Sequence, residues 1–480
     1  MNTPDTVQLP AYDRARLTAG IVHIGLGNFH RAHMAVYLDD LFAMGQGLDW
    51  ALIGAGVRAP DTAMRDALVA QDCLSTVITL DPAGKSARRI GAMIDFLPVS
   101  PDNAPLIAAM TAPAIRIVSL TVTEGGYFIN PATGAFDPTA PEIAADAASP
   151  AAPGTAFGAI VAALRARRDG GTAPFTVMSC DNLPGNGHVT KAAVVGLARL
   201  SDPAFADWIN ANVAFPNGMV DRITPATGPR ERALAASFGL NDPVPVTCEP
   251  FRQWVLEDHF PTGRPPLEQV GVTFTSHVHA FEMMKIRILN GGHATIAYPG
   301  GLMDIEFVHE AMAHPLILGL LNKVEREEII PTVPPVPGTD IPAYYDLIVQ
   351  RFSNPEIADT ERRLCLDGSN RQPKFIVPAL RDALAAGGAI DGLALVSALW
   401  ARYCYGQTDS GSVIAPNDPN WDVLQALAIE AKSNPAAWLT QDTIYGDTAQ
   451  DPRFVAAFTK WLAMLWAKGT KVTLQSYLGI

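Results

Sequence analysis

The stretch Ile-Val-His-Ile at residues 21–24, followed by glycines at positions 25 and 27, constrains the fold of this chain more than any other feature. Its residues favour a strand, and the glycines end that strand before a helical pattern that runs from residue 30 to about residue 44. Further strands are predicted at residues 50–53, 76–80, 115–122 and 175–179, with helix-compatible segments between several of them. Because strands that alternate with helices form parallel sheets, the sequence predicts an α/β fold with a doubly wound, Rossmann-type sheet.

The second part of the chain has a different pattern. Long helical periodicities replace strands from about residue 280, at residues 281–298, 304–324, 372–386, 391–404, 421–431 and 451–468. A chain of 480 residues is also too long for one ordinary core. We therefore predict two domains, a dinucleotide-binding domain at residues 1–278 and a mainly α-helical, substrate-binding domain at residues 279–480.

Composition narrows the class of partner. The net charge is −13 and lysine and arginine form no block, so neither nucleic acid nor an anionic membrane is an expected partner. The first twenty residues lack the apolar core of a secretory signal, and no apolar run reaches 18 residues. The five cysteines are widely spaced and form no CxxC pair, which is typical of reduced thiols. We expect a cytoplasmic protein that acts on a small molecule.

The glycine turn is a candidate cofactor site. Gly25 and Gly27 permit a tight turn, so that the backbone of the loop with Asn28 and Phe29 could approach a pyrophosphate. The third glycine of the usual fingerprint is replaced by His30, so an ordinary glycine turn is the alternative reading of this motif.

Two neighbouring features bear on what this turn would bind. Arg31 is suited to a phosphate. His30 and His33 have a spacing that could serve a metal, but no third ligand follows nearby, so we expect no metal site.

Cofactor preference depends on the residues after the second strand. Asp61 would bind the hydroxyls of the adenosine ribose and favour NAD, whereas Arg58 could tolerate the extra phosphate of NADP. We expect NAD and leave NADP open.

The segment KIRILNGGH at residues 285–293 is the sharpest candidate for catalysis. On an ideal α-helix, Glu282, Lys285, Asn290 and His293 would fall within an arc of about 140°. A solvent-exposed polar stripe is the alternative, but the neighbouring residues are mostly apolar, and paired glycines at 291–292 weaken a helix unless another group must approach closely.

A partly buried lysine at this position could act as a general base. Desolvation lowers an amine pKa, which would make Lys285 usable as a base near neutral pH. Asn290, and Asn182 from the turn after the strand at 175–179, could donate hydrogen bonds to an oxygen that gains negative charge. His293 could orient a substrate hydroxyl. Glu124, at the end of the strand at 115–122, is either a solvated turn residue or part of a proton path.

Seven motifs, in this order, make the chain similar to a known family. They are the glycine turn, TVTEGGY at 121–127, SCDNLPGNG at 179–187, MVDRITP at 219–225, EPFRQWV at 249–255, KIRILNGGH at 285–293 and DGSNRQPK at 367–374. The chain resembles the polyol-specific long-chain dehydrogenases over nearly its whole length.

This resemblance implies a metal-independent, nicotinamide-dependent enzyme that leans towards a monomer. It implies that Lys285 is the catalytic base, that Asn182 and Asn290 form an oxyanion hole, and that His293 contacts substrate. It further implies that Glu124 and Glu282 form a proton relay. The polyol pocket would be formed by Asp221, Arg363 and Arg371. The resemblance leads us to expect a lysine at position 371, where this chain has an arginine.

The expected reaction is reversible oxidation of an acyclic polyol to a ketose, with D-mannitol and D-fructose as the expected pair. Fructuronate reduction and D-arabinitol 4-oxidation are alternatives with the same architecture, because Arg363 and Arg371 could bind a carboxylate. An NAD-sensing protein without catalysis is the alternative from another class, although sensing would need no buried base.

Overall fold

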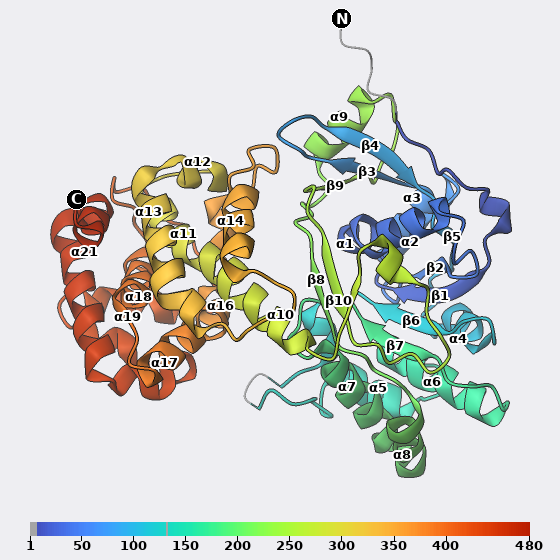
Figure 1. Ribbon diagram of the computed structural model, residues 1–480. Helices are drawn as coiled ribbons and strands as arrows, with labels where there is room; N and C mark the ends of the chain where they lie inside the picture. The colour runs from blue at the N-terminus through green and yellow to red at the C-terminus, as the bar shows by residue number, and fades with distance from the viewer. Residues whose placement is uncertain (1–6, 131–132) are drawn as a thin grey trace, which may run out of the picture. The chain divides into compact units, whose positions relative to one another are not determined.

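The computed structural model describes residues 7–130 and 133–480, and the chain divides into two compact units, Met1–His279 and Ala280–Ile480. The first unit is built around sheets and the second is helical (Figure 1). The predicted fold class is therefore confirmed.

A five-stranded, fully parallel sheet forms the centre of the first unit. Its strands follow the order β5-β2-β1-β6-β7. Their bounds are β1 Ala19–Ile24, β2 Ala51–Ala55, β5 Met93–Phe96, β6 Ile117–Leu120 and β7 Thr176–Ser179. The chain starts in the middle of the sheet, builds outwards on one side and then continues on the other, so the strand order reverses between β1 and β6. In such sheets ligands bind beyond the carboxyl ends of the strands at this switch point.

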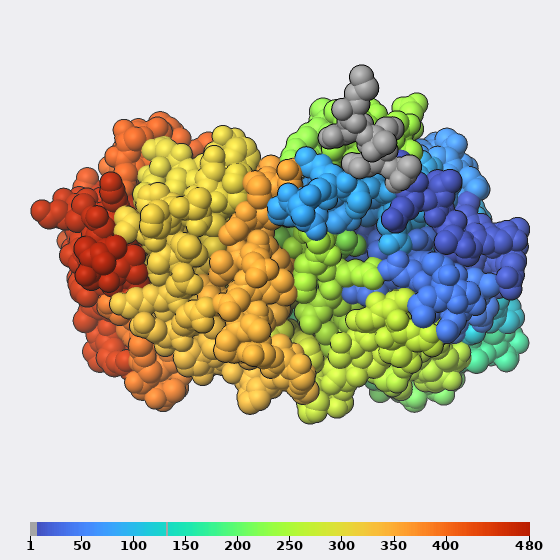
Figure 2. Space-filling model, turned by 45° about the horizontal axis from the view of Figure 1, so that its top comes forward, coloured from blue at the N-terminus to red at the C-terminus, as the bar shows by residue number. Residues whose placement is uncertain are grey.

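The strand predicted at residues 76–80 does not belong to this sheet. It is β3, Ser75–Thr79, which pairs antiparallel with β4, Ser86–Ile90, and parallel with β9, Val246–Cys248. The short turn between β3 and β4 folds the chain back as a hairpin, so β5 takes the place at the edge of the central sheet. Figure 2 shows the β3–β4 hairpin, in light blue, on the surface of the first unit. A third sheet contains β8 Gly218–Asp221, β10 Gln253–Leu256 and β11 Thr273–Phe274.

Two hydrophobic cores lie on the two faces of the central sheet. Successive side chains of β1 alternate between them: Ile21 joins the core that contains helix α2, and Val22 joins the core that contains α6 and α7. Figure 1 shows α2 on one side of the central sheet and α6 and α7 on the other. The helices of this unit are α1 Asn28–Ala32, α2 Met34–Ala43, α3 Asp61–Val69, α4 Ala104–Thr111, α5 Pro141–Ala148, α6 Ala156–Asp169, α7 Asn186–Ser201, α8 Pro203–Asn212 and α9 Pro229–Ser237, with short 3₁₀ turns at Arg14–Arg16, Glu124–Tyr127 and Leu267–Val270.

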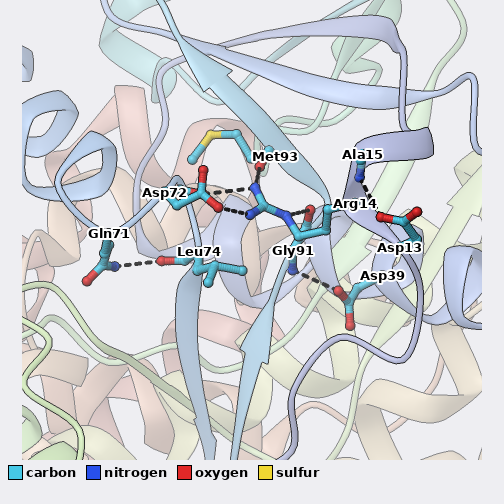
Figure 3. A network of polar contacts seen from close by, with 9 residues as sticks. All are labelled: Asp13, Arg14, Ala15, Asp39, Gln71, Asp72, Leu74, Gly91 and Met93. Atoms are coloured by element: carbon cyan, nitrogen blue, oxygen red, sulfur yellow. Dashed lines mark hydrogen bonds and ion pairs between the residues drawn. The ribbon is translucent and has the colours of Figure 1, made fainter.

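Arg14 fastens the segment before β1 to the edge of this unit. Its Nε donates to the carbonyl of Gly91 at 3.1 Å, and its Nη2 donates to the carbonyls of Met93 at 2.9 Å and Asp72 at 2.8 Å (Figure 3). Its Nη1 also pairs with the Asp72 carboxylate, which is 80% exposed. Because water screens an exposed ion pair, the bonds to the carbonyls carry most of the stabilisation.

Replacement of Arg14 by Met should lower the free energy of unfolding by about 1–3 kcal/mol, because the bonds to the carbonyls are lost. Asp72→Asn is the matched control, since it removes the ion pair and keeps the carbonyls, and it should cost less than about 1 kcal/mol. Urea denaturation measures both. Equal losses in the two variants would contradict this assignment.

Helices make up the second unit. They are α10 Val278–Met284, α11 Gly291–Leu302, α12 Val308–Ala313, α13 Pro315–Val324, α14 Ile341–Phe352, α15 Glu361–Leu364, α16 Gly368–Phe375, α17 Val377–Ala385, α18 Asp391–Cys404, α19 Trp421–Ala431, α20 Asp442–Tyr445 and α21 Pro452–Leu478, with 3₁₀ turns at Ile330–Thr332, Pro435–Thr440 and Gly446–Gln450. The pattern at 304–324 predicted one helix, and this is wrong: Pro315 lacks an amide proton and starts a new helix there. α18 and α21 pack together in the core, with Trp400 and Trp461 buried between helices.

Two segments of this unit are π-helical, Lys285–Asn290 and Glu325–Ile329. The first joins α10 to α11, so the pattern predicted as one α-helix at 281–298 is an α-π-α helix. π-helical turns are rare and are found at functional sites more often than elsewhere.

All five cysteines are buried and free. In the described part of the chain, no helix combines the length and the apolar character needed to cross a bilayer.

Candidate active site

The glycine turn of the first unit has a backbone conformation that requires glycine. Gly25 has φ +89°, and a Cβ atom there would lie 2.3 Å from the carbonyl oxygen of Thr121. At Gly27 a Cβ would meet nothing closer than 4.0 Å, so the backbone is open on that side. This combination fits a loop that a dinucleotide phosphate approaches closely.

The helix predicted at residues 30–44 is interrupted. α1 ends at Ala32, and His33 has the non-helical angles φ −120° and ψ −92° before α2 begins. His33 is buried, its Nε2 lies 2.9 Å from the carbonyl of Gln253, and its ring stacks on Phe29. These side-chain contacts hold the break in place.

Arg31 and Asn28 brace the turn from within the protein. The Arg31 guanidinium is buried and donates to the carbonyls of Gly27 and Val244 and to Oδ1 of Asn28. The Asn28 amide nitrogen donates to the carbonyl of Pro225 at 3.1 Å and to Thr227 Oγ1 at 2.8 Å. These contacts hold the loop itself, and the phosphate contact expected of Arg31 stays a prediction.

Asp61 begins α3 beyond the end of β2. One carboxylate oxygen accepts from the amides of Val57 at 3.1 Å and Arg58 at 3.0 Å, and the other lies 3.4 Å from the Arg58 guanidinium. These amides fix the position of the carboxylate beyond the end of β2, and its contact with a ribose stays a prediction.

The ends of β6 and β7 are tied together by Asp181. Its carboxylate accepts from the amides of Val122 and Thr123, both at 2.9 Å, and from the hydroxyl of Tyr127 at 2.7 Å. Burial raises the pKa of Asp181, and the hydrogen bonds oppose this shift. Two predicted site residues, Asn182 and Glu124, are both exposed on the loops that Asp181 joins. The structure therefore brings these two loops together. Asp221, at the end of β8, is buried.

Lys285 and Asn290 are the first and last residues of a π-helical segment. In an α-helix, residues i and i+5 are about 140° apart around the axis. A π-helix closes each turn between i and i+5, so these two side chains lie about one turn apart on the same side of the helix. The ideal α-helical geometry assumed from the sequence was therefore wrong at this point. The π-helical segment reduces the angle around the helix axis between the side chains of Lys285 and Asn290. Lys285 is only 7% exposed, and Glu282 is also buried, so neither is part of a solvated stripe.

His293 lies among arginines. Its ring stacks on Phe352, with 4.1 Å between centroids and 14° between planes. Desolvation, and then the positive charges of Arg363, Arg351 and Arg371, lower the pKa of His293 well below its usual value. A neutral imidazole has one donor and one acceptor nitrogen, which suits a hydroxyl partner.

Two of these arginines already have partners inside the second unit. Arg363 donates through Nε and Nη2 to both carboxylate oxygens of Asp359. Arg371 Nη1 donates to the carbonyls of Leu364 at 2.9 Å and Arg363 at 3.3 Å, at the end of α15. The structure thus places Arg363 and Arg371, both predicted for the substrate pocket, within electrostatic reach of His293.

A buried carboxyl group escaped prediction from the sequence. Glu325 is 0% exposed, and neither of its carboxyl oxygens has a hydrogen-bond partner among the described residues. A Cβ at Gly292 would lie 3.2 Å from its Oε1 and 3.3 Å from the ring of Phe352. The groups that approach Gly292 most closely are therefore this carboxyl and the ring that supports His293, whereas Gly291 faces the carbonyl of Phe375 and the side chain of Ile329. Gly300 lies in the same helix as Gly292, α11, and the side chain of Glu361 approaches it in a similar way.

Burial raises the pKa of Glu325 well above its usual value, so the folded protein favours the neutral acid. A carboxyl whose pKa is higher in the folded state stabilises the fold below its unfolded pKa of about 4.5, and that contribution is lost as the pH rises. Glu325→Gln keeps the shape and stays neutral.

The free energy of unfolding of Glu325→Gln should therefore increase relative to that of wild type as the pH rises above about 4.5, by up to about 1.4 kcal/mol per pH unit, so that the variant becomes relatively more stable. Urea denaturation at several pH values measures this difference. Glu327→Gln, in the exposed part of the same π-helical segment, is the matched control and should leave the pH dependence unchanged. A constant difference between Glu325→Gln and wild type would contradict a neutral Glu325.

Among the residues that the structure describes, no three His, Cys, Asp or Glu side chains form a group that could hold a metal ion.

Two family models together match most of the chain. Residues 19–269 match the mannitol dehydrogenase Rossmann domain, and residues 277–466 match the mannitol dehydrogenase C-terminal domain. A protein named mannitol 2-dehydrogenase from Cereibacter sphaeroides is 70% identical over 473 residues, which cover 98% of this chain and 99% of that protein. A mannitol 2-dehydrogenase from Aspergillus terreus is 42% identical over 99% of this chain and 96% of its own length.

Two solved structures are also similar over the whole chain. The Pseudomonas fluorescens mannitol 2-dehydrogenase in ternary complex with NAD and D-mannitol is 44% identical, has a TM-score of 0.87 and matches 99% of this chain and 97% of its own. A substrate-free D-sorbitol dehydrogenase is 36% identical, has a TM-score of 0.90 and matches 98% of each chain.

Proposed function

Because the chain belongs to the mannitol dehydrogenase family, as its motifs predicted, we propose that it oxidises D-mannitol at C2 to D-fructose and catalyses the reverse reduction. The chain is an NAD-dependent polyol dehydrogenase. D-Mannitol is the proposed substrate because the relatives that match nearly the whole chain carry that name, and one of them was solved with NAD and D-mannitol.

The first unit has the features needed to hold NAD, which supplies the hydride acceptor. Gly25 and Gly27 present backbone at the end of β1, with Asn28, Phe29 and Arg31 supporting the turn. Asp61 is the proposed partner of the adenosine ribose, and its fixed carboxylate supports NAD as the preferred cofactor.

Lys285 is the proposed general base. It is held in a buried position, and burial disfavours the charged ammonium, so its neutral form can take the hydroxyl proton from C2 as hydride leaves the same carbon. Asn290 follows one π-turn later and donates a hydrogen bond to the alkoxide as charge develops, which lowers the barrier because the bond is strongest in the transition state. The alignment of Lys285 and Asn290 by the π-helical segment is the observation that carries this proposal.

Further roles follow from the same chemistry. We assign Asn182 the role of a second amide donor, and we assign Glu124 and Glu282 to a proton relay. Neutral His293 binds a substrate hydroxyl. Asp221, Arg363 and Arg371 are the proposed residues of the polyol pocket, and no metal ion takes part in the proposed reaction. A cytoplasmic location and a monomeric state remain predictions.

Lys285→Ala should lower kcat by about 10²–10⁴, because the proton would have no positioned acceptor. Initial rates at saturating NAD and D-mannitol, followed across pH, measure the effect. Lys471→Ala, an exposed lysine in α21, is the control and should retain full activity. An unchanged turnover and pH profile in a folded Lys285→Ala enzyme would refute the role of Lys285.

Fructuronate reduction is the nearest alternative. The bidentate pairing with Asp359 neutralises the charge of Arg363, and the bonds to carbonyls occupy Nη1 of Arg371. Both contacts disfavour a substrate carboxylate relative to a neutral polyol.

An absorbance assay at the reduced nicotinamide band separates the alternatives. With mannitol, sorbitol, arabinitol, fructose and fructuronate as substrates, we expect the highest kcat/KM for mannitol in oxidation and for fructose in reduction. A higher kcat/KM for fructuronate would favour the uronate reductase. Dinucleotide binding without turnover of any of these compounds would favour the sensing protein.

A further inference from the structure

A chain of hydrogen bonds runs from the centre of the parallel sheet to the glycine turn. His23 on β1 is paired in register with Ser119 on β6, so both side chains lie on the same face. Nδ1 of His23 lies 2.8 Å from Ser119 Oγ, and Nε2 lies 2.9 Å from Thr121 Oγ1. Thr121 Oγ1 in turn lies 2.6 Å from the carbonyl oxygen of Gly25. His23 and Ser119 are fully buried, so the contact between them is made without competition from water, whereas Thr121 is half-buried.

Only one arrangement of protons satisfies this chain. The Gly25 carbonyl can only accept, so the Thr121 hydroxyl donates its single proton to that carbonyl. The Thr121 oxygen must then accept from His23, which places the imidazole proton on Nε2. A neutral ring with Nε2–H has a bare Nδ1, and Nδ1 accepts from the Ser119 hydroxyl. Burial, which lowers the pKa of His23 to about 3, agrees with a neutral ring.

His30 holds the same ring from its face. The two imidazoles stack with 3.4 Å between centroids and 18° between planes. His30 is buried, and its own nitrogens have no hydrogen-bond partner within residues 7–130 and 133–480. His30 is the residue that replaces the third glycine of the dinucleotide fingerprint. Its side chain, which makes the motif atypical, stacks on His23 and holds the position of that ring.

The chain of bonds determines which way the peptide after Gly25 points. The peptide bond is planar and trans, so a carbonyl held towards Thr121 directs the amide of Leu26 to the opposite side. Gly25 has φ +89°, a region in which glycine moves easily, so this peptide needs an external restraint. If the peptide were to flip, it would present a carbonyl oxygen to an anion where an amide is needed.

We propose that His23, as the neutral Nε2–H tautomer, is a positioning residue that acts through Thr121 to hold the Gly25 carbonyl inwards and the Leu26 amide towards the pyrophosphate of NAD. This proposal rests on the assignment of the glycine turn to the cofactor. It predicts that loss of the Thr121 hydroxyl weakens NAD binding and leaves the chemistry of the polyol unaffected.

Thr121→Val removes the hydroxyl at nearly constant shape, and Thr121→Ser keeps it. Thr121→Val should raise both the KM for NAD and the Kd for NADH about tenfold, the equivalent of one hydrogen bond, with kcat at saturating NAD and the KM for mannitol unchanged. Thr121→Ser should stay within about twofold of wild type. Equal effects of the two variants on binding, or parallel changes in the KM values for NAD and mannitol, would overturn the proposal.

Two replacements of His23 test the donor itself. Glutamine can place an amide near the position of Nε2 and so donate to Thr121, whereas asparagine reaches only the position of Nδ1. We expect His23→Gln to retain most of the NADH affinity and His23→Asn to lose it. If both variants lose it equally while remaining folded, the relay is wrong.

A spectroscopic measurement on the wild-type protein covers the case in which these variants fail to fold. With ¹⁵N-labelled histidine, the ring of His23 should show a protonated Nε2 and a bare Nδ1, and the reverse tautomer would overturn the proposal.

NADH titration of wild type by fluorescence distinguishes a failure of the proposed function from a failure of the proposed role of His23. Failure of wild type to bind NADH would remove the proposed function, whereas tight NADH binding that is unaffected by Thr121→Val would remove only the relay.

Discussion

The proposed site in the second unit depends on one constraint: a buried amine and a carboxamide five residues later must lie on the same side of a helix. The sequence spacing of five residues between Lys285 and Asn290 does not achieve this in an α-helix, and the π-helical segment does. Such a segment costs regular hydrogen bonding, so the surrounding structure has to stabilise it. Gly292, just beyond it, allows Glu325 and Phe352 to pack directly against the helix, and Phe352 in turn supports His293.

Glycines act in both units as places where another group approaches the backbone. In the first unit Gly25 meets the carbonyl of Thr121, and in the second Gly292 and Gly300 meet the buried carboxyl groups of Glu325 and Glu361. A side chain at any of these positions would displace the neighbour that gives the local structure its function. These close approaches explain why glycine stands within regular elements or at their ends, where it would otherwise weaken them.

Much of the fold could be predicted from residue patterns, and the failures have identifiable causes. The strand at residues 21–24 and the helices at 391–404 and 421–431 were predicted correctly, because their periodicity is not interrupted. The strand at 76–80 was placed in the wrong sheet, since strand propensity does not determine which partner a strand pairs with. The break at His33 depends on contacts with residues far away in the sequence, such as Gln253.

The candidate site was only partly predictable. KIRILNGGH gave the polar residues, but an α- and a π-helix share the same local composition, so the alignment of Lys285 with Asn290 was not visible. Glu325 stands in the run EREEI, which reads as a solvated charged surface, and only the tertiary structure shows that it is buried. The roles that family resemblance assigns to Asp221, Arg363 and Arg371 stay predictions.

The burial of all five cysteines has a practical consequence. Burial raises the pKa of each thiol, so at neutral pH the reactive thiolate is scarce and shielded, and the folded enzyme should tolerate air and alkylating reagents without added reductant.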